Sequence, residues 1–372
     1  MNTKIWLSSP HLTGEEQKYV KEAFDTNWVA PLGPNVNGLE KDICNYTGAK
    51  ACSALSSGTA AIHLALILLG IEENDEVLCS SFTFSATVNP IRYQKAIPIF
   101  VDSEKDTWNM SPVLLEAAIQ DRIANHKKPK AILLVHLYGM PSKMDEILTI
   151  SKKYEIPLIE DAAEAIGATY KDKAMGTFGE LGIFSFNGNK IITTSGGGAL
   201  VSNNSNYCKK ATFLATQARD DAPHYQHSQV GYNYRMSNIA AGIGRGQMEV
   251  LDDRVEARRK NFEFYKKELA SIKEIFFVEE PADFYANRWL TTILTDSYET
   301  REKIRIALEK ENIESRPLWK PMHLQPVFQE YPAYVDGTSE DLFNRGLCLP
   351  SGSNLKDEES QRTVYHIKSI FN

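Results

Sequence analysis

Short apolar runs alternate with stretches of helical pattern between about residues 50 and 202, and this alternation restricts the fold most. The runs cover residues 76–80, 96–102, 131–136, 156–161, 182–187 and 198–202. Helical patterns such as 60–69 and 144–154 lie between them. Apolar runs of this length without a polar–apolar alternation are typical of strands that are buried on both faces. The sequence therefore predicts an α/β domain with a mixed, mostly parallel sheet.

A second region follows this domain. From about residue 248 to residue 269 the pattern becomes charged and helical, and the remainder reads as mixed helix and strand. Strands interleaved with helices in this way favour a separate, smaller α+β unit. We therefore predict a large domain over residues 1–247, which includes the N-terminal segment, and a small C-terminal domain over residues 248–372.

Charge and cysteine content exclude several classes of partner. The chain has 41 Lys+Arg and 48 Asp+Glu, which gives a net charge of −7. This surplus of acid disfavours nucleic acid and anionic membrane surfaces. No apolar run approaches the roughly 20 residues of a membrane span, and residues 1–6 show no basic stretch followed by an apolar one, so we expect neither export nor membrane insertion. Five cysteines without a CxxC pair argue against a disulfide framework and a zinc knot, so we expect a cytoplasmic protein.

The first candidate site segment is a turn of small residues that runs into a helix. Ser57, Gly58 and Thr59 open this helix. Free N–H groups and the positive end of the helix dipole suit a phosphate at such a place, and glycine lets the backbone approach it. The alternative is an ordinary helix cap, since Ser and Thr are common at that position.

The second segment is an apolar strand that ends in carboxylates, at Glu160, Asp161 and Glu164. Ligands of open α/β sheets bind at the carboxyl ends of the strands. A carboxylate there can hold a cationic ring nitrogen or a metal ion. A metal site would need histidines or further clustered acids nearby, which the neighbouring sequence does not supply, so a ring nitrogen is the better interpretation, and no metal is predicted. Capping of a helix by Asp161 is the alternative.

The third segment contains a lysine between a strand and a glycine-rich turn. Lys190 follows the run 182–187 and precedes Gly196, and no acidic residue is close to it in sequence. A lysine amine that is kept out of water becomes a nucleophile able to form a Schiff base with an aldehyde. A surface lysine is the alternative.

The fourth segment follows the strand 76–80 and contains Phe82 and Phe84. Either ring could stack on a flat aromatic ligand, and we expect one of the two to lie in the core. A nucleophilic lysine, a strand-end aspartate, an aromatic plate and a phosphate-binding helix start are what pyridoxal 5′-phosphate (PLP) requires, because the aspartate keeps the pyridine nitrogen protonated.

These residues lie in motifs that resemble those of a known protein family. The chain resembles the nucleotide-sugar aminotransferases of PLP fold type I, the DegT-like family, from about residue 7 to residue 352. The matching motifs are 57–61, 81–87, 160–164, 185–190 with 196–198, 231–238 and 316–323. The form of 187–190 and of 316–323 is most similar to the branch that aminates UDP-linked 4-keto-6-deoxy-N-acetyl sugars on the route to bacillosamine-type sugars. The resemblance implies an aspartate-aminotransferase-like fold and a homodimer with shared active sites.

The resemblance also implies roles for individual residues. Lys190 would form the internal aldimine and shuttle the proton, Asp161 would pair with the pyridine nitrogen, and Glu164 would lie near the ring hydroxyl. The other cofactor contacts would come from Ser57, Gly58, Thr59, Phe84, Ser185 and, in the partner subunit, Asn233. The candidates for substrate contacts are Tyr225, Arg235, Arg316 and His323. For Arg235 a structural salt bridge is an equal alternative.

The reaction implied is a two-stage amino transfer from L-glutamate, through pyridoxamine phosphate, to the keto carbon of a nucleotide-linked sugar. The substrate by resemblance is UDP-2-acetamido-2,6-dideoxy-hexos-4-ulose, and a GDP- or dTDP-linked keto sugar is the alternative. Two rivals use the same scaffold. Sugar dehydratases of this type carry histidine in place of the lysine, so Lys190 argues against them, whereas a non-catalytic PLP-binding regulator would keep the cofactor site.

Overall fold

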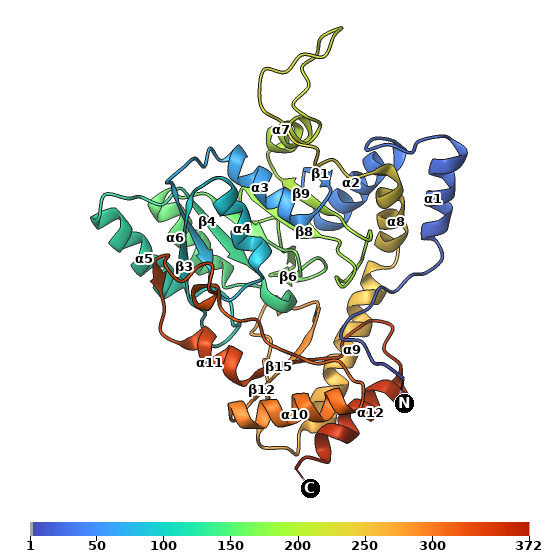
Figure 1. The fold of residues 1–372 in the computed structure, drawn as a ribbon, viewed down its shortest axis with the longest axis vertical. Coiled ribbons are helices and arrows are strands. Elements are labelled where there is room, and N and C mark those ends of the chain that lie inside the picture. Colours follow the sequence, from blue (N-terminus) through green and yellow to red (C-terminus); the bar gives the residue numbers. More distant parts are fainter. Residues whose placement is uncertain (1–2, 372) are drawn as a thin grey trace.

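The computed structural model describes residues 3–371, and its centre is an eight-stranded sheet (Figure 1). The strand order is β1-β9-β8-β5-β4-β2-β3-β14. In that order the strands are Ala51–Leu55, Gly198–Ser202, Leu181–Ser185, Leu158–Asp161, Ala131–Val135, Glu76–Ser80, Ile97–Val101 and Ala333–Tyr334. The β1–β9 and β9–β8 pairs are antiparallel and the other adjacent pairs are parallel.

Helices cover both faces of this sheet. One face carries α3, α4 and α7, and the other carries α2, α5 and α6. In chain order these helices are α2 Pro34–Thr47, α3 Gly58–Leu68, α4 Ser85–Tyr93, α5 Pro112–Ala124, α6 Met144–Tyr154 and α7 Ser205–Ala215. Strand β2 shows the consequence, since Val77 and Cys79 pack on the first face and Leu78 on the second. The prediction of strands buried on both faces is therefore confirmed.

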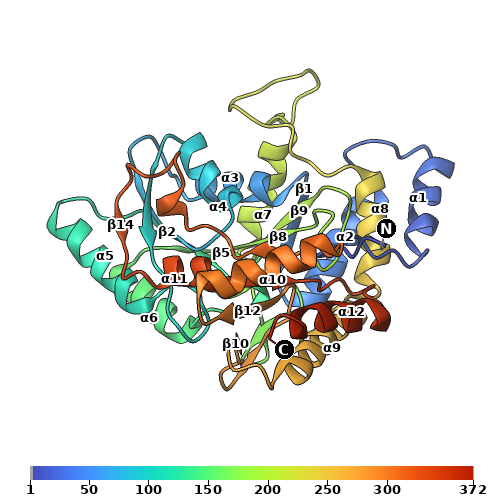
Figure 2. The same cartoon turned by 60° about the horizontal axis from the view of Figure 1, so that its bottom comes forward.

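The C-terminal part of the chain forms a smaller antiparallel sheet in the order β10-β12-β15-β13. These strands are Ile275–Phe277, Thr291–Thr295, Gly346–Leu349 and Arg316–Pro317. The remaining long helices are α1 Glu16–Asp25, α8 Asn238–Met248, α9 Leu251–Leu269, α10 Tyr298–Lys310, α11 Thr338–Arg345 and α12 Asp357–Lys368. Figure 2 brings α10, α11 and α12 to the front of the molecule. Residues of α9, α10, α12 and this sheet share one apolar core with Ile5.

Short pairings tie the two parts of the chain together. Strand β11, Phe284–Tyr285, pairs with β6, Thr169–Tyr170, which in turn pairs with β7, Lys173–Ala174. Strand β14 returns from the C-terminal region to the edge of the large sheet beside β3. Near the N-terminus, Ile5 pairs with Ile313. The division of the chain at residues 247 and 248 stays a prediction, and these three pairings cross it.

The segment between α7 and α8 projects from the rest of the molecule, above α7 in Figure 1. Short 3₁₀ turns occupy Leu137–Gly139 and Met322–Leu324. Within residues 3–371, no helix combines the length and the apolar character that crossing a bilayer requires.

Candidate active site

The carboxyl ends of the central strands open onto a cavity of about 670 Å³. Its lining includes nine of the residues predicted from the sequence, namely Ser57, Gly58, Thr59, Phe84, Asp161, Glu164, Ser185, Lys190 and Arg316. The topology explains this convergence, because β5 and β8 are parallel neighbours and Asp161 is in register with Ile183. Residues far apart in sequence therefore meet at one edge of the sheet. The C-terminal region closes the cavity with Trp289 and Trp319.

Lys190 projects into this cavity from the turn that joins β8 to β9. Its side chain is only 13% exposed, and its Nζ lies 3.2 Å from Glu164 Oε1. The same Nζ lies 4.0 Å from the centroid of the Trp289 ring. Lys190 is therefore held largely out of water, as the sequence predicted, and is not a surface lysine.

Asp161 ends strand β5 and is held by two hydrogen bonds. Thr87 Oγ1 donates to Oδ2 at 2.7 Å, and the Ala163 N–H donates to Oδ1 at 3.1 Å. Burial raises the pKa of Asp161 above its ordinary value, and these bonds with the charge of Lys190 offset only part of the rise. A neighbouring cation would stabilise this carboxylate, which is what a protonated ring nitrogen supplies.

Glu164 lies on the other side of the lysine. It accepts a hydrogen bond from the Tyr138 N–H at 2.7 Å, through Oε2. Burial raises the pKa of its carboxyl to about 7, although Lys190 and the Tyr138 N–H both favour the charged form. Asp161 adds to the rise by repulsion. The Glu164 carboxyl is therefore balanced between its two protonation states near neutral pH.

Glu160, the third carboxylate of this segment, points away from the cavity, as the alternation of side chains along a strand requires. It accepts hydrogen bonds from the N–H groups of Gly176, Phe178 and Gly179 and lies 3.0 Å from His136 Nε2. Burial would raise its pKa, but the bond to His136 and the N–H groups outweigh burial, and the pKa falls below its ordinary value. Glu160 therefore holds the loop before β8.

The start of α3 forms a close-packed cradle with β8 and β9. A Cβ added to Gly198 would lie 2.4 Å from the Gly58 nitrogen, and one added to Gly58 would lie 3.2 Å from Ser185 Cβ. Ser57 Oγ accepts from the Ala60 N–H at 3.0 Å, so Ser57 also caps the helix. The first N–H groups of a helix have no partner within it and suit an anion. The cradle and the lysine–aspartate pair thus fit PLP.

The two phenylalanines of the fourth segment have different surroundings. Phe82 is 2% exposed and belongs to the core. Phe84 is 55% exposed, lines the cavity, and its ring lies 5.3 Å from that of Trp319. Phe84 is therefore the ring that can meet a flat ligand.

Arg316 reaches the cavity from β13. Its Nη2 lies 3.0 Å from Glu314 Oε1, and the Arg316 side chain is 68% exposed. Glu314 Oε2 also accepts the Leu7 N–H at 3.1 Å, which ties the N-terminal segment to this wall.

Four predicted residues lie outside the cavity of the single chain. Tyr225 is 79% exposed on the projecting segment, with the Arg219 guanidinium 4.6 Å from its ring, and Asn233 is also exposed. His323 Nδ1 lies 2.6 Å from Ser81 Oγ, and burial lowers the pKa of this imidazole. Arg235 forms an ion pair with Glu40 and donates to the Ala54 carbonyl at 3.0 Å. The geometry of Arg235 is that of the structural salt bridge.

Sequence reasoning missed three residues that shape the cavity. Thr87 and Trp319 lie in the motifs 81–87 and 316–323, but neither was assigned a role of its own. Trp289 carries no local signal, because single aromatic residues in a mixed region are ordinarily core residues. Only the packing of the C-terminal region onto the large sheet brings them to Lys190 and Phe84.

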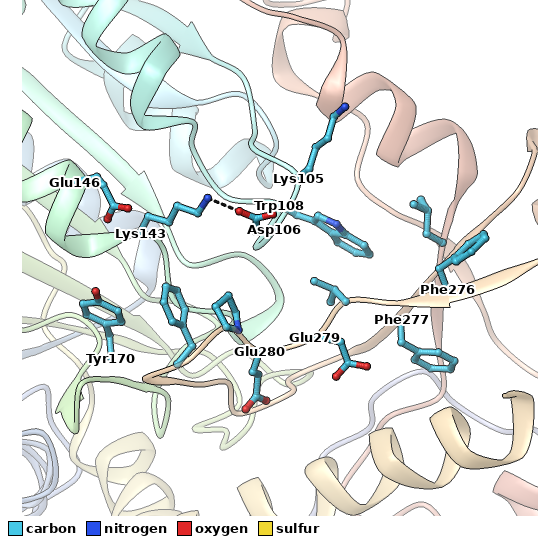
Figure 3. Close-up of a pocket in the computed structure, with 14 residues that line it drawn as sticks. Lys105, Asp106, Trp108, Lys143, Glu146, Tyr170, Phe276, Phe277, Glu279 and Glu280 are labelled. Carbon is cyan, nitrogen blue, oxygen red and sulfur yellow. Dashed lines mark hydrogen bonds and ion pairs between the residues drawn. The ribbon is translucent and has the colours of Figure 1, made fainter.

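A second cavity, of about 650 Å³, lies between the loop before α5 and strand β10 (Figure 3). Trp108 and Phe277 form part of its apolar lining, and Lys143 is directed at Asp106 across 2.5 Å. None of the residues predicted for the site lines it. Among its charged lining residues, Lys143 and Asp106 pair with each other, whereas Glu279 and Glu280 pair with Lys266 and Arg259, which do not line the cavity.

The family is shown by comparison with known proteins. Residues 10–368 match the sequence profile of the DegT/DnrJ/EryC1/StrS aminotransferase family. The chain belongs to this family. Aminotransferases of the DegT family use PLP, and the fit of the cavity agrees with that cofactor. The chain is accordingly a PLP-dependent sugar aminotransferase, and the fold predicted from the sequence is confirmed.

Individual relatives match almost the whole chain. EpsN of Bacillus subtilis strain 168, provisionally named a pyridoxal phosphate-dependent aminotransferase, is 54% identical over 100% of this chain and 97% of its own length. GDP-perosamine synthase of Escherichia coli O157:H7 is 40% identical over 98% of this chain and 97% of its own. The provisionally named sugar aminotransferase Spr1654 of Streptococcus pneumoniae, solved in a PLP form, superposes with a TM-score of 0.91 at 25% identity and covers 99% and 98% of the two chains.

Proposed function

We propose that this aminotransferase moves the amino group of L-glutamate to the keto carbon of a nucleotide-linked 4-keto-6-deoxy sugar. The observation that carries the proposal is the pairing of Lys190 Nζ with Glu164 at 3.2 Å, beside the buried Asp161, in a cavity of about 670 Å³. A cavity of this volume holds the reacting part of a sugar nucleotide. In the balanced reaction glutamate leaves as 2-oxoglutarate and the ketone becomes an amine.

Different residues of the cavity are proposed to bind different parts of PLP. Gly58, Thr59 and Ser185 would hold the phosphate, Asp161 would hold the ring nitrogen, and Phe84 would cover the ring. PLP, when bound, supplies an aldehyde and an electron-withdrawing ring. Lys190 would bind the cofactor and would take and return the proton that moves between carbons during amino transfer, because a lysine amine held out of water can act as both nucleophile and base. Glu164 holds the lysine ammonium in place.

Arg316 is the residue proposed to hold the oxyanions of the substrates. A guanidinium binds a carboxylate or a phosphate through two parallel hydrogen bonds. An ion pair as exposed as Arg316–Glu314 contributes at most about 1 kcal/mol, so exchange of Glu314 for a substrate oxyanion costs little. His323 and Tyr225 are proposed contacts for the sugar or the nucleotide.

The nucleotide proposed is UDP, on a 2-acetamido-2,6-dideoxy-hexos-4-ulose, because motifs 187–190 and 316–323 resemble the bacillosamine-type branch. A GDP-linked keto sugar is the second candidate, and the 40% identity to GDP-perosamine synthase of Escherichia coli O157:H7 favours it.

We propose a homodimer in the cytoplasm, in which Asn233 reaches the cofactor phosphate of the partner subunit. The exposure of Asn233 and of Tyr225, together with the projection of the segment that carries Tyr225, supports this arrangement (Figure 1). Arg235 is the least supported substrate contact, because Glu40 already binds it.

The test has two stages. The PLP-loaded protein is first mixed with L-glutamate, and its visible spectrum should shift to that of the pyridoxamine form. UDP-, GDP- and dTDP-linked keto sugars are then added separately, and the productive one should restore the first spectrum and yield an amino sugar. A protein that binds PLP but shows no shift with glutamate would be a regulator, which would overturn the proposal.

A further inference from the structure

Lys190 has a second neighbour whose role the reaction alone does not specify. Trp289 is 2% exposed, lines the cavity, and presents its ring to Lys190 Nζ at 4.0 Å. A cation over an indole face is attracted by the quadrupole of the ring, and more strongly where water is excluded. The lysine ammonium is thus in contact with both the Glu164 carboxylate and the Trp289 ring.

The indole is held in this position by the hydrogen bond of its ring N–H, and the backbone of Trp289 is held by bonds to its N–H and its carbonyl. The Trp289 N–H donates to Asn287 Oδ1 at 2.9 Å, and the ring Nε1 donates to the Asn189 carbonyl at 2.8 Å. The Trp289 carbonyl accepts from Arg258 Nη1 at 2.5 Å. The ring is therefore attached to the turn that carries Lys190, at the residue before it.

Asn287 connects the two neighbours of the lysine. Its side chain is fully buried, and Nδ2 donates to the carbonyls of Glu164 and Ile166, both at 2.8 Å. A Cβ added to Gly139 would lie 1.8 Å from Asn287 Oδ1, so the amide sits directly against that glycine. One amide thereby fixes the spacing between the segment of Glu164 and the backbone of Trp289.

Arg258 of α9 strengthens the same frame. Its guanidinium is 1% exposed and donates to the carbonyls of Trp289, Ser351 and Lys190 and to the hydroxyl of Ser8. These four acceptors are neutral, and a charged group buried among neutral partners costs stability. Proteins accept unfavourable arrangements of this kind, such as a buried charge without a counter-charge, mainly at functional sites. The N-terminal segment, the Lys190 turn and the C-terminal region meet at this side chain.

We propose that Trp289 is a positioning residue for Lys190: the indole ring of Trp289 holds the lysine ammonium beside Glu164 and shields it from water. The proposal rests on the proposed role of Lys190 as the reacting amine. Lys190 must remain at one place while it holds a proton, since a misplaced base loses rate steeply. Asn287 and Arg258 set the place of the ring.

Two substitutions separate the ring from the rest of the residue. Trp289→Phe keeps an aromatic face and Trp289→Met removes it. With glutamate in single-turnover experiments, Trp289→Met should lower the maximal rate by about 30-fold, while Trp289→Phe stays within about threefold of the parent. The glutamate concentration at half-maximal rate should change by less than about twofold in both, because Trp289 acts on the lysine. The matched control is Trp6→Met, since Trp6 also pairs with a lysine, Lys4, at 5.5 Å but is 59% exposed.

A second measurement uses the cofactor-free protein. Acetic anhydride labels lysine amines, and mass spectrometry gives the labelling of Lys190 relative to Lys95, which is 69% exposed. This ratio should rise by about tenfold in Trp289→Met and stay unchanged in Trp289→Phe and Trp6→Met. If Trp289→Met does not fold, the ratio in Trp289→Phe decides, and a rise there overturns the proposal.

The outcomes distinguish this inference from the proposed function. A parental maximal rate in Trp289→Met, or an equal loss in Trp289→Phe and Trp289→Met, would overturn the role of the ring and leave that of Lys190 intact. Full activity in Lys190→Ala would instead overturn the proposed function itself.

Discussion

The two cavities described above have almost the same volume, about 670 and 650 Å³, and differ in their charges. In the first, Asp161 and Glu164 are 5% and 4% exposed, and both lie near the amine of Lys190. In the second, the Asp106 side chain is 66% exposed and already paired with Lys143. Volume alone does not mark a site. A functional site is indicated instead by charged groups that are held out of water, because burying a charge costs free energy.

The largest difference between the cavities should appear on removal of their lysines. Lys190→Ala should lose at least about 10⁴-fold in amino transfer, because the covalent contact and the proton carrier are both lost. The loaded variant should also lack the absorbance of covalently bound PLP. Lys143→Ala, in the second cavity, is the matched control and should transfer amino groups at the parental rate.

Asp161→Asn should have the next largest effect. An amide keeps the shape and can still accept from Thr87, but it cannot balance a positive ring nitrogen. We expect a loss of about 10²- to 10³-fold in the maximal rate of the glutamate half-reaction. Stopped-flow spectra at saturating glutamate measure this rate. A parental rate would contradict the assignment of Asp161 to the ring nitrogen.

The raised pKa of the Glu164 carboxyl predicts that the stability of the cofactor-free protein depends on pH. Its carboxyl pKa is raised from 4.5 to about 7, so the folded state binds more protons than the unfolded state between these values. Stability from this group is therefore complete below about pH 4.5, falls as the pH rises toward 7, and is level above it.

Glu164→Gln removes this titration. The difference in unfolding free energy between the variant and the parent should grow by about 3 kcal/mol from pH 4.5 to above pH 7, in favour of the variant. Urea unfolding across this range gives the difference. A pH-independent difference would show that Glu164 is not the titrating group.

The smallest effect is expected in the second cavity. Asp106→Asn breaks an ion pair whose aspartate is mostly exposed, and such pairs contribute up to about 1 kcal/mol. Lys143 retains Glu104 at 2.9 Å, which reduces the loss further. Urea unfolding should therefore show a change of less than about 1 kcal/mol, and activity should stay at the parental level. A loss of activity here would mean that the second cavity also serves the reaction.

Local patterns predicted the parts of the site that the large sheet carries. Strand and helix limits at 76–80, 144–154 and 198–202 agree with the structure. Buried strands and amphipathic helices each require a characteristic spacing of apolar residues, which is visible in the sequence. Asp161, Glu164 and Lys190 could be recognised because each lies at the end of such a strand or in the following turn. Strand β1 was missed, because Ala51–Leu55 has no strong apolar run.

What depends on contacts between distant segments was not predictable. The alternation of side chains along β5 explains why Glu160 and Asp161 point in opposite directions, but the three backbone N–H groups that Glu160 binds come from the loop 176–179 and meet it only after folding. The strand β14 and the pairing of Ile5 with Ile313 likewise follow from chain segments that meet only after folding.

The sequence alone thus predicted the α/β class, most strands of the large sheet, and the positions of Lys190, Asp161, Glu164 and the turn 57–59 that line the cavity, since these follow from local periodicity and from residue type at strand ends. The tertiary structure decided which groups surround Lys190. Trp289 is 99 residues away from it in sequence and reaches it because Asn287 and Arg258 join the C-terminal region to the turns of the large sheet. Contacts of this kind carry no local period, and only the folded chain creates them.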